Sequence, residues 1–299
     1  SFELDTTAPV IGIDGSIEGD DRVSASEVGD VLVSGTSTGA EAGQTVTVGF
    51  SDSASTPNTQ TASVTVAADG SWSLAGSEVD LSGFEDGQVV VTADVSDAAG
   101  NAAQQSTASF ELDTTAPVIE SVVLDADELT DADVGSMVTL SLGFSEAMDT
   151  AVAPGVSVSA DSSLINPTGG SWSQDGKTYS LDYEVADGGD FADPLTVDVS
   201  GARDVAGNVQ SQALALESNA VVDTENPQVS SVSLSDELLT DADVGGTVTL
   251  SVVFSEAMDT AQTPVISVST SSTLINPVNG RWSSDGTAYL LDYTVADSD

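Results

Sequence analysis

The stretch Asp113-Thr114-Thr115-Ala116-Pro117-Val118 decides how this chain of 299 residues is organised. An identical copy stands at Asp5-Thr6-Thr7-Ala8-Pro9-Val10, and a looser one at Asp223-Thr224-Glu225-Asn226-Pro227-Gln228. The three copies begin 108 and then 110 residues apart, which is about the length of one small all-β domain. A motif that recurs at this period predicts a string of domains, with the motif as the linker between neighbours.

Further blocks repeat at the same offset of 110 residues. Residues 129–135, 144–150 and 164–167 return at 239–245, 254–260 and 274–277. We predict the last strand and linker of a preceding module in residues 1–8 and two complete domains in 9–113 and 114–223. A third domain, C-terminally truncated, is predicted in 224–299 because the copy stops before its final two strands. It is therefore expected to be poorly ordered there or completed by another segment.

Short alternating runs of Val, Thr, Ser and Leu, separated by Gly, Asp and Ser, indicate β-strands throughout. No stretch has a helical period. The predicted fold class is therefore all-β, with tandem immunoglobulin-like β-sandwich domains arranged end to end. Asp69-Gly70, Asp175-Gly176 and Asp285-Gly286 are typical of tight hairpin turns. In the first module, strands are expected at 10–13, 31–37, 45–50, 61–66, 71–74, 89–95 and 103–112.

The chain is strongly acidic, with 49 Asp and Glu against 4 Lys and Arg and a net charge of −45. Nucleic acid is excluded as a partner because binding it requires clustered cations, and an anionic membrane surface is disfavoured for the same reason. No apolar run reaches the roughly 18 residues of a membrane span, so no direct membrane insertion is expected. The clustered acids require a counter-ion that four side chains cannot supply, which predicts divalent metal or high salt.

Two residue types are missing from the sequence. With no Cys there are no disulfides or thiolate metal sites, and with no His the commonest general base is absent. Pairs of carboxylates remain as candidates for glycosidase-type catalysis. They recur from module to module in polar turns, whereas an enzyme usually has one site, so the sequence predicts no catalysis.

An immunoglobulin-like sandwich sorts the acidic loops into two groups. With the seven expected strands of a module numbered in order, loops 2–3 and 6–7 lie at the N-terminal pole, where the chain enters, and loops 1–2 and 5–6 lie at the C-terminal pole, where it leaves. In the second module, Glu146 and Asp149 belong to loop 2–3, and Asp204 and Asn208 belong to loop 6–7. Each linker acid should therefore lie between C-terminal-pole acids of one module and N-terminal-pole acids of the next. The C-terminal-pole acids are Glu18, Asp20, Asp21, Glu85 and Asp86 in the first module and Asp127, Asp131, Asp133, Asp187 and Asp190 in the second.

Acidic and amide oxygens that converge on a linker predict a metal site. Calcium takes six to eight oxygen ligands at about 2.3–2.6 Å with flexible geometry, whereas magnesium requires a tighter octahedron and retains water. Calcium ions, bound between neighbouring repeats of the same chain, are therefore the predicted partners. The candidate ligands are Asp5, Asp97, Asn101, Asp20, Asp21, Asp113, Glu146, Asp149, Asp204, Asn208, Asp131, Asp133, Asp223, Glu256 and Asp259.

The Asp-Thr-Thr-Ala-Pro linkers, the Asp-Ala-Ala-Gly-Asn and Asp-Val-Ala-Gly-Asn loops at 97–101 and 204–208, and the Phe-Ser-Glu-Ala-Met-Asp blocks resemble a known family. They are similar to the tandem bacterial immunoglobulin-like repeats of giant repeats-in-toxin-type and biofilm-associated adhesins. The resemblance implies a secreted, surface-anchored rod whose linkers are stiffened by calcium and which holds an adhesive tip away from the cell. It also implies linker ligands at Asp5, Asp113 and Asp223, and loop ligands at Asp97, Asn101, Asp204 and Asn208.

Two other functions fit the same residues. A ligand-binding module would grip a glycan, ice or a host protein, although 5% aromatic residues offer little material for such a surface. A surface-layer-type structural protein of a salt-loving organism would use acidity for solubility alone, and the acidic motifs would then be ordinary turns.

Overall fold

The computed structural model describes residues 4–211, 213–269 and 273–297, and it divides the chain into two compact units, Ser1–Thr224 and Glu225–Asp299. The all-β prediction is confirmed, since the described residues contain no α-helix. Their only helical segments are three 3-10 turns: η1 (Ile17–Gly19), η2 (Asp131–Asp133) and η3 (Asp241–Asp243).

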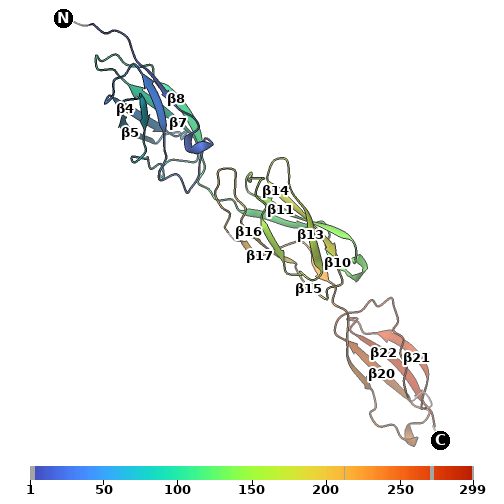
Figure 1. Ribbon diagram of the computed structural model, residues 1–299. Helices are drawn as coiled ribbons and strands as arrows, with labels where there is room; N and C mark the ends of the chain where they lie inside the picture. The colour runs from blue at the N-terminus through green and yellow to red at the C-terminus, as the bar shows by residue number, and fades with distance from the viewer. Residues whose placement is uncertain (1–3, 212, 270–272, 298–299) are drawn as a thin grey trace. The chain divides into compact units, whose positions relative to one another are not determined.

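Residues 9–113, called module one below, fold into two sheets. The smaller sheet has the order β1-β3-β6, and the larger has the order β2-β8-β7-β4-β5, of which Figure 1 labels four strands. Val46, Val48 and Phe50 alternate with more exposed residues along β4, and this period of two turns their side chains into the core. The strands are β1 (Val10–Ile13), β2 (Arg22–Val23), β3 (Ser34–Thr38), β4 (Thr45–Ser51), β5 (Thr59–Thr65), β6 (Ser71–Ser73), β7 (Gly87–Val95) and β8 (Ser106–Leu112).

All seven strands expected in module one are present. The first has the expected bounds, the other six have shifted ends, and β2 is an addition. The Asp69-Gly70 turn exists, but the hairpin prediction was wrong. The turn joins β5 to β6, which pair with β4 and β3 in different sheets. Tight turns also carry a chain from one sheet to the other, and sequence does not distinguish the two uses.

Residues 114–223, called module two, also contain two main sheets and a small third one. Their orders are β13-β14-β11-β9, β12-β16-β17 and β10-β18-β15. Asp175-Gly176 closes the β13–β14 hairpin as predicted. The strands are β9 (Ile119–Leu124), β10 (Glu128–Thr130), β11 (Met137–Phe144), β12 (Gly155–Val158), β13 (Leu164–Trp172), β14 (Thr178–Val185), β15 (Phe191–Ala192), β16 (Thr196–Ser200), β17 (Ala213–Glu217) and β18 (Val221–Asp223).

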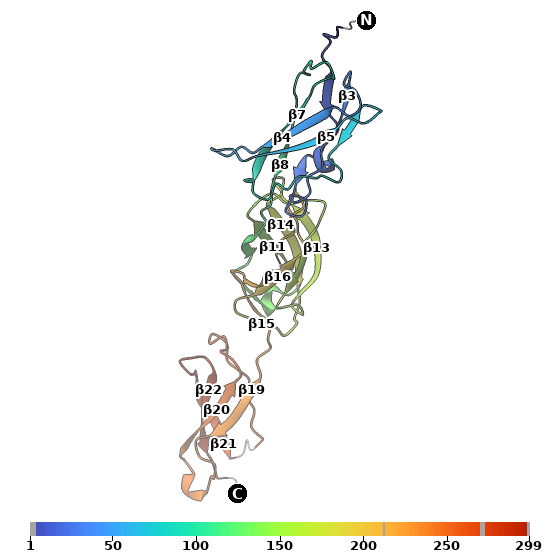
Figure 2. The ribbon, with the colours of Figure 1, turned by 90° about the vertical axis from the view of Figure 1, so that its left-hand side faces the viewer.

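The second unit, called module three, has the sheet order β19-β20-β22-β21, labelled in Figure 2. This order repeats the first sheet of module two, and Asp285-Gly286 closes its hairpin as predicted. The described residues of this unit form no second sheet. Val232 is accordingly 60% exposed, whereas Val122, its counterpart 110 residues earlier in module two, is 9% exposed. The strands are β19 (Val229–Leu234), β20 (Thr247–Phe254), β21 (Leu274–Trp282) and β22 (Ala288–Val295).

Two further predictions concern the N-terminal segment and the domain boundaries. The strand expected in residues 1–8 is not seen in the described part of that segment, because residues 4–8 have no strand, and residues 1–3 lie outside the description. The domain boundaries remain predictions. The buried apolar side chains nevertheless form three clusters, within residues 11–112, 122–222 and 248–295.

Candidate metal centre at the linker of module two

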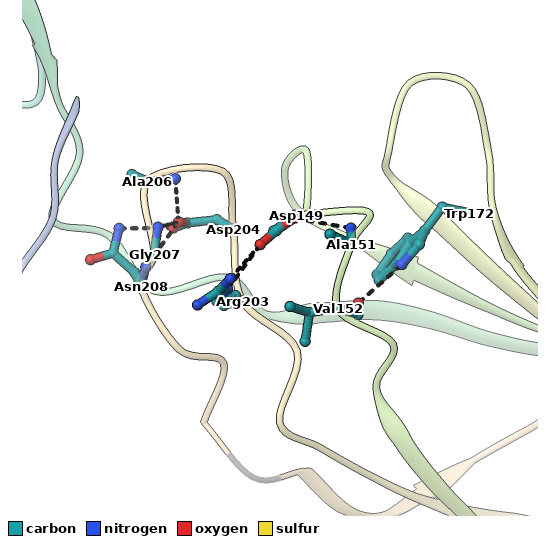
Figure 3. Close-up of polar contacts among 9 residues, drawn as sticks. All are labelled: Asp149, Ala151, Val152, Trp172, Arg203, Asp204, Ala206, Gly207 and Asn208. Carbon is teal, nitrogen blue, oxygen red and sulfur yellow. Dashed lines mark hydrogen bonds and ion pairs between the residues drawn. The ribbon is translucent and has the colours of Figure 1, made fainter. Parts of the chain in front are cut away.

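The loop from Ala202 to Gln210 in module two is built around the buried carboxylate of Asp204. One oxygen of Asp204 accepts the backbone N–H groups of Ala206, Gly207 and Asn208 at 2.8, 2.7 and 2.9 Å (Figure 3). Gly207 has a φ of +100°, a conformation that favours glycine. The sequence Asp-x-Ala-Gly-Asn thus folds into a tight loop that fixes the direction of one carboxylate.

A second loop, between β11 and β12, lies beside this one. Met148 forms a β-bridge with Asp204, and the Asp149 N–H donates to the Arg203 carbonyl at 2.9 Å. Loops 2–3 and 6–7 of the module therefore meet, as the pole scheme predicts. This pairing brings Glu146, near the start of the β11–β12 loop, toward Asp204.

Three carboxylates converge where the linker enters module two. Asp113 of the linker, Glu146 and Asp204 each place an oxygen within 4.8 Å of the others. This is the one such group among the residues that the structure describes. All three belong to the predicted ligands, and they come from the linker and from both loops.

The negative charge of the group is only partly compensated by neighbouring protein groups. Burial, and then the charges of Asp113 and Asp204, raise the pKa of Glu146 to about 7, and Lys177 opposes this rise only in part. Burial also raises the pKa of Asp113, as do Asp204 and Asp86, against a hydrogen bond from the Thr115 N–H. Like charges held this close favour protonation of one member or a bound cation.

The donor set fits calcium. Three carboxylates supply three to six of the oxygens that calcium requires, and loop carbonyls and water can complete the shell. With no imidazole or thiolate in the chain, the donors are all hard oxygens, which suits calcium or magnesium better than a transition metal.

Asp149 does not join this group. Its carboxylate pairs with Arg203 at 2.7 Å and also accepts the Ala151 N–H at 3.0 Å (Figure 3). The hydrogen bonds from the Ala151 N–H and the Arg203 guanidinium, and then the charge of Arg203, lower the pKa of Asp149. In the structure Asp149 pairs with a guanidinium outside the three-carboxylate group, and its role as a metal ligand remains a prediction.

Asn208 lies next to the group but has its side chain fully engaged. Its Nδ2 donates to the Asp113 carbonyl and to the Asp204 carboxylate, both at 2.8 Å. Its Oδ1 accepts the backbone N–H of Ala25 in module one at 2.8 Å. The predicted ligand oxygen thus already has a partner.

Asp20 and Asp21 stabilise their own turn. Asp20 accepts the Arg22 N–H at 3.1 Å, and Asp21 accepts the Ile17 N–H at 2.9 Å. Neither is a member of the three-carboxylate group described above. Their predicted role at the Asp113 linker is therefore not supported by the placement of their carboxylates.

Asp86 lies near the three-carboxylate group but was not among the predicted ligands. Its carboxylate accepts the Thr114 N–H and hydroxyl at 2.9 and 2.8 Å and the Thr115 hydroxyl at 2.7 Å. It adds negative charge near Asp113 and Glu146. Its place among the C-terminal-pole acids was the signal that could have found it.

The corresponding loop of module one repeats the hydrogen bonds of the Asp204 loop, but among the described residues it does not repeat the group of three carboxylates. Asp97 accepts the Asn101 N–H and Nδ2, each at 2.8 Å, and Asn101 also donates to the Asp5 carbonyl at 3.3 Å. Glu41 accepts the Ala98 N–H at 2.8 Å. Glu41 stands on loop 2–3, as Glu146 does, and the sequence analysis missed it.

The candidates at the third linker fall into both units. Thr130 pairs in register with Asp223, so Asp131 and Asp133 follow directly on a strand beside that linker acid. Asp133 accepts the Thr130 N–H at 2.9 Å. Glu256 and Asp259 belong to module three, where Asp259 accepts the Ala261 N–H at 2.9 Å. A shared site with Asp223 remains a prediction.

The three tryptophans pack within their own modules. Trp72 is buried, while Trp172 and Trp282 donate their indole N–H to the carbonyls of Val152 and Gln262 at 3.1 and 2.7 Å. The rings of Trp172 and Trp282 also contact neighbouring Phe and Tyr rings.

A family comparison bears on the sandwich of module one. Residues 34–114 match the bacterial Ig-like domain family. The immunoglobulin-like fold class predicted above is thereby confirmed. No curated protein matches the chain.

Two solved structures are similar to this chain. One is described as a tetra-tandem repeat in the extending region of a large adhesion protein, with 22% identity and a TM-score of 0.30. The match covers 97% of this chain and 66% of that one, which is less than two thirds of its length. The other comes from work on host cell surface retention of a 1.5-MDa bacterial ice-binding adhesin, with 22% identity, coverage of 97% and 87%, and a TM-score of 0.39.

Among the described residues, no helix has the length and apolar character needed to cross a membrane.

Proposed function

We propose that this chain is a calcium-stiffened extender, or stalk, segment of a large bacterial cell-surface adhesin, which holds a distal adhesive tip away from the cell. The observation that carries the proposal is the convergence of Asp113 with Glu146 and Asp204. A carboxylate of the linker meets two carboxylates of the following module, so any cation bound there ties linker and module together.

The role is structural, extracellular and non-catalytic. Immunoglobulin-like modules in tandem, the acidic composition and the repetition of the Asp-x-Ala-Gly-Asn loop at 97–101 and 204–208 support it. The loops supply the same chemistry at successive linkers, as a stalk requires, whereas an enzyme concentrates its reactive groups in one cleft.

The chain's own residues perform most of the work. Asp204 is fixed in direction by three backbone N–H groups, and Glu146 is held beside it by the adjacent loop. Asp113 belongs to the linker, so a cation shared by its carboxylate and the other two would tie the linker to module two. A calcium ion would supply the positive charge that offsets the mutual repulsion of the three carboxylates.

The test is a thermal melt of the chain in calcium and in a chelator, with sodium chloride matched for ionic strength. Calcium should raise the melting temperature of module two, and Asp113→Asn should abolish most of that rise. Glu128→Gln, which removes an exposed acid of β10, serves as the matched control and should keep it. An equal rise with matched sodium chloride would overturn the proposal in favour of general charge screening.

A further inference from the structure

Asn208 connects three parts of the chain through one side chain, and every partner of its amide is a protein group. It is 6% exposed, and its amide lies between the Ala25 N–H of module one, the Asp113 carbonyl of the linker and the Asp204 carboxylate of module two. All three distances are 2.8 Å. In Figure 3 its carbonyl oxygen points away from Asp204.

The contacts fix the orientation of the amide. Nδ2 faces two acceptors and Oδ1 faces a donor, so rotating the amide by half a turn would oppose like groups at every contact. The two amide hydrogens and the carbonyl oxygen are all engaged. A buried side chain with its hydrogen-bonding capacity filled is a poor metal ligand but an effective structural connector.

In module one, the Ala25 N–H is available to donate to Asn208. A hydrogen-bonded turn follows Ser24, whose carbonyl accepts the N–H groups of Glu27 and Val28 at 3.1 and 3.0 Å. Ala25 is thus the first residue of that turn, where the backbone N–H has no partner within the turn. Asn208 provides the acceptor.

We propose that Asn208 is a cation-independent latch, a positioning residue that holds the β2–η1 end of module one against the Asp204 loop before any metal binds. It keeps Asp113 within reach of Glu146 and Asp204 by gripping the Asp113 carbonyl. Asn101 grips the Asp5 carbonyl in the same way in module one, at 3.3 Å. This recurrence indicates that the Asn of each loop fixes the preceding linker.

The test measures the mobility of the junction in a chelator. The chain has no cysteine, so Ser63→Cys on β5 and Ser171→Cys on β13, both exposed, allow one spin-label pair to span the two modules. The latched chain should give a single narrow distance distribution by pulsed electron paramagnetic resonance. Asn208→Ala should lose that narrow peak. Asn101→Ala, which makes the equivalent change at the other loop, should retain it.

Ala25→Pro is the second variant. Proline removes the N–H in question, and its fixed φ is favoured at the second position of a turn such as Ser24–Glu27, so module one should still fold. It should broaden the distribution as Asn208→Ala does. A narrow distribution in Ala25→Pro, or a broad one in the unaltered chain, would overturn the latch.

These measurements are made without calcium, so they stand apart from the stalk proposal. If calcium fails to stabilise module two but both variants broaden the distribution, the latch holds and the metal proposal fails. If calcium stabilises module two but neither variant has an effect in the chelator, the reverse is true.

Discussion

Glu146 lies half-buried between the linker acid Asp113 and the loop acid Asp204, and its protonation is coupled to the fold. Its pKa rises from an ordinary 4.5 to about 7, first through burial and then through those two charges. A carboxyl whose pKa is higher in the folded state than in the unfolded state stabilises the fold at low pH, and this contribution is lost as pH rises through the folded value.

The first prediction follows from that sign. In a chelator, the contribution of Glu146 to the stability of module two should be greatest below about pH 4.5. It should fall as the pH rises to about 7. Glu146→Gln should remove this fall and stabilise the metal-free chain at pH 8 by on the order of 1 kcal/mol, after discounting for solvent screening. Urea denaturation at several pH values measures both. A slope that survives in Glu146→Gln would assign it to other groups.

The second prediction separates Asp149 from the metal group. Asp149→Asn should cost at most about 1 kcal/mol, because the pair with Arg203 is partly exposed to solvent. The calcium-induced rise in melting temperature should be unchanged. Asp204→Asn, on the facing loop, should lose it. Loss of the calcium-induced rise in both variants would instead identify Asp149 as a ligand.

Individual strands show why some glycines are required. Gly35 in β3 lies against the indole of Trp72 on β6, and a Cβ there would collide with that ring and with the Gly12 carbonyl. The third prediction is that Gly35→Ala destabilises module one by about 1–3 kcal/mol, the usual cost of overpacking. Gly29→Ala, which has open space at the same atom, is the control. Denaturant titration followed by tryptophan fluorescence compares them, and equal midpoints would contradict the packing.

Much of the element level was predictable from sequence. Alternation placed the strands of module one, and the repeat of 110 residues predicted that module three would copy module two. Strand ends and the use of the Asp69-Gly70 turn were not predictable, because they depend on which sheet receives the next strand. Periodicity reports which side chains face inward and is silent about pairing partners.

The sequence predicted which loops form the candidate site, but not which residues of those loops lie in it. Sequence placed Glu146 and Asp149 on one loop at the correct pole, but the bridge from Met148 to Asp204 decides which of the two carboxylates turns toward the linker. Arg203 then captures Asp149. Glu41 and Asp86 were missed because their roles depend on backbone groups brought near by folding, at Ala98 and Thr114.

At the scale of the whole molecule, the two units should differ in stability. Positions buried in module two are more exposed in module three, as Val122 and Val232 illustrate, so less apolar surface leaves water. The fourth prediction is two calorimetric transitions, the lower one belonging to module three. Val252→Ala should shift only the lower transition.

Leu142→Ala, the matched substitution 110 residues earlier, should shift only the upper transition, by the equivalent of about 2–5 kcal/mol. A single transition, or a Val252→Ala shift in the upper one, would contradict this assignment.

The parallel pairs β2–β8 and β10–β18 have a mechanical consequence. Each pair joins a strand near the start of a module to the last strand of that module. In module one the Asp113 N–H donates to the Val23 carbonyl at 3.0 Å, and in module two the Val221 N–H donates to the Asp127 carbonyl at 2.9 Å. A pull on the two ends of a module loads these bonds in shear, so they must rupture together and cannot unzip singly. A tether made of such modules would resist drag through its slow forced unfolding, even where its equilibrium stability is modest.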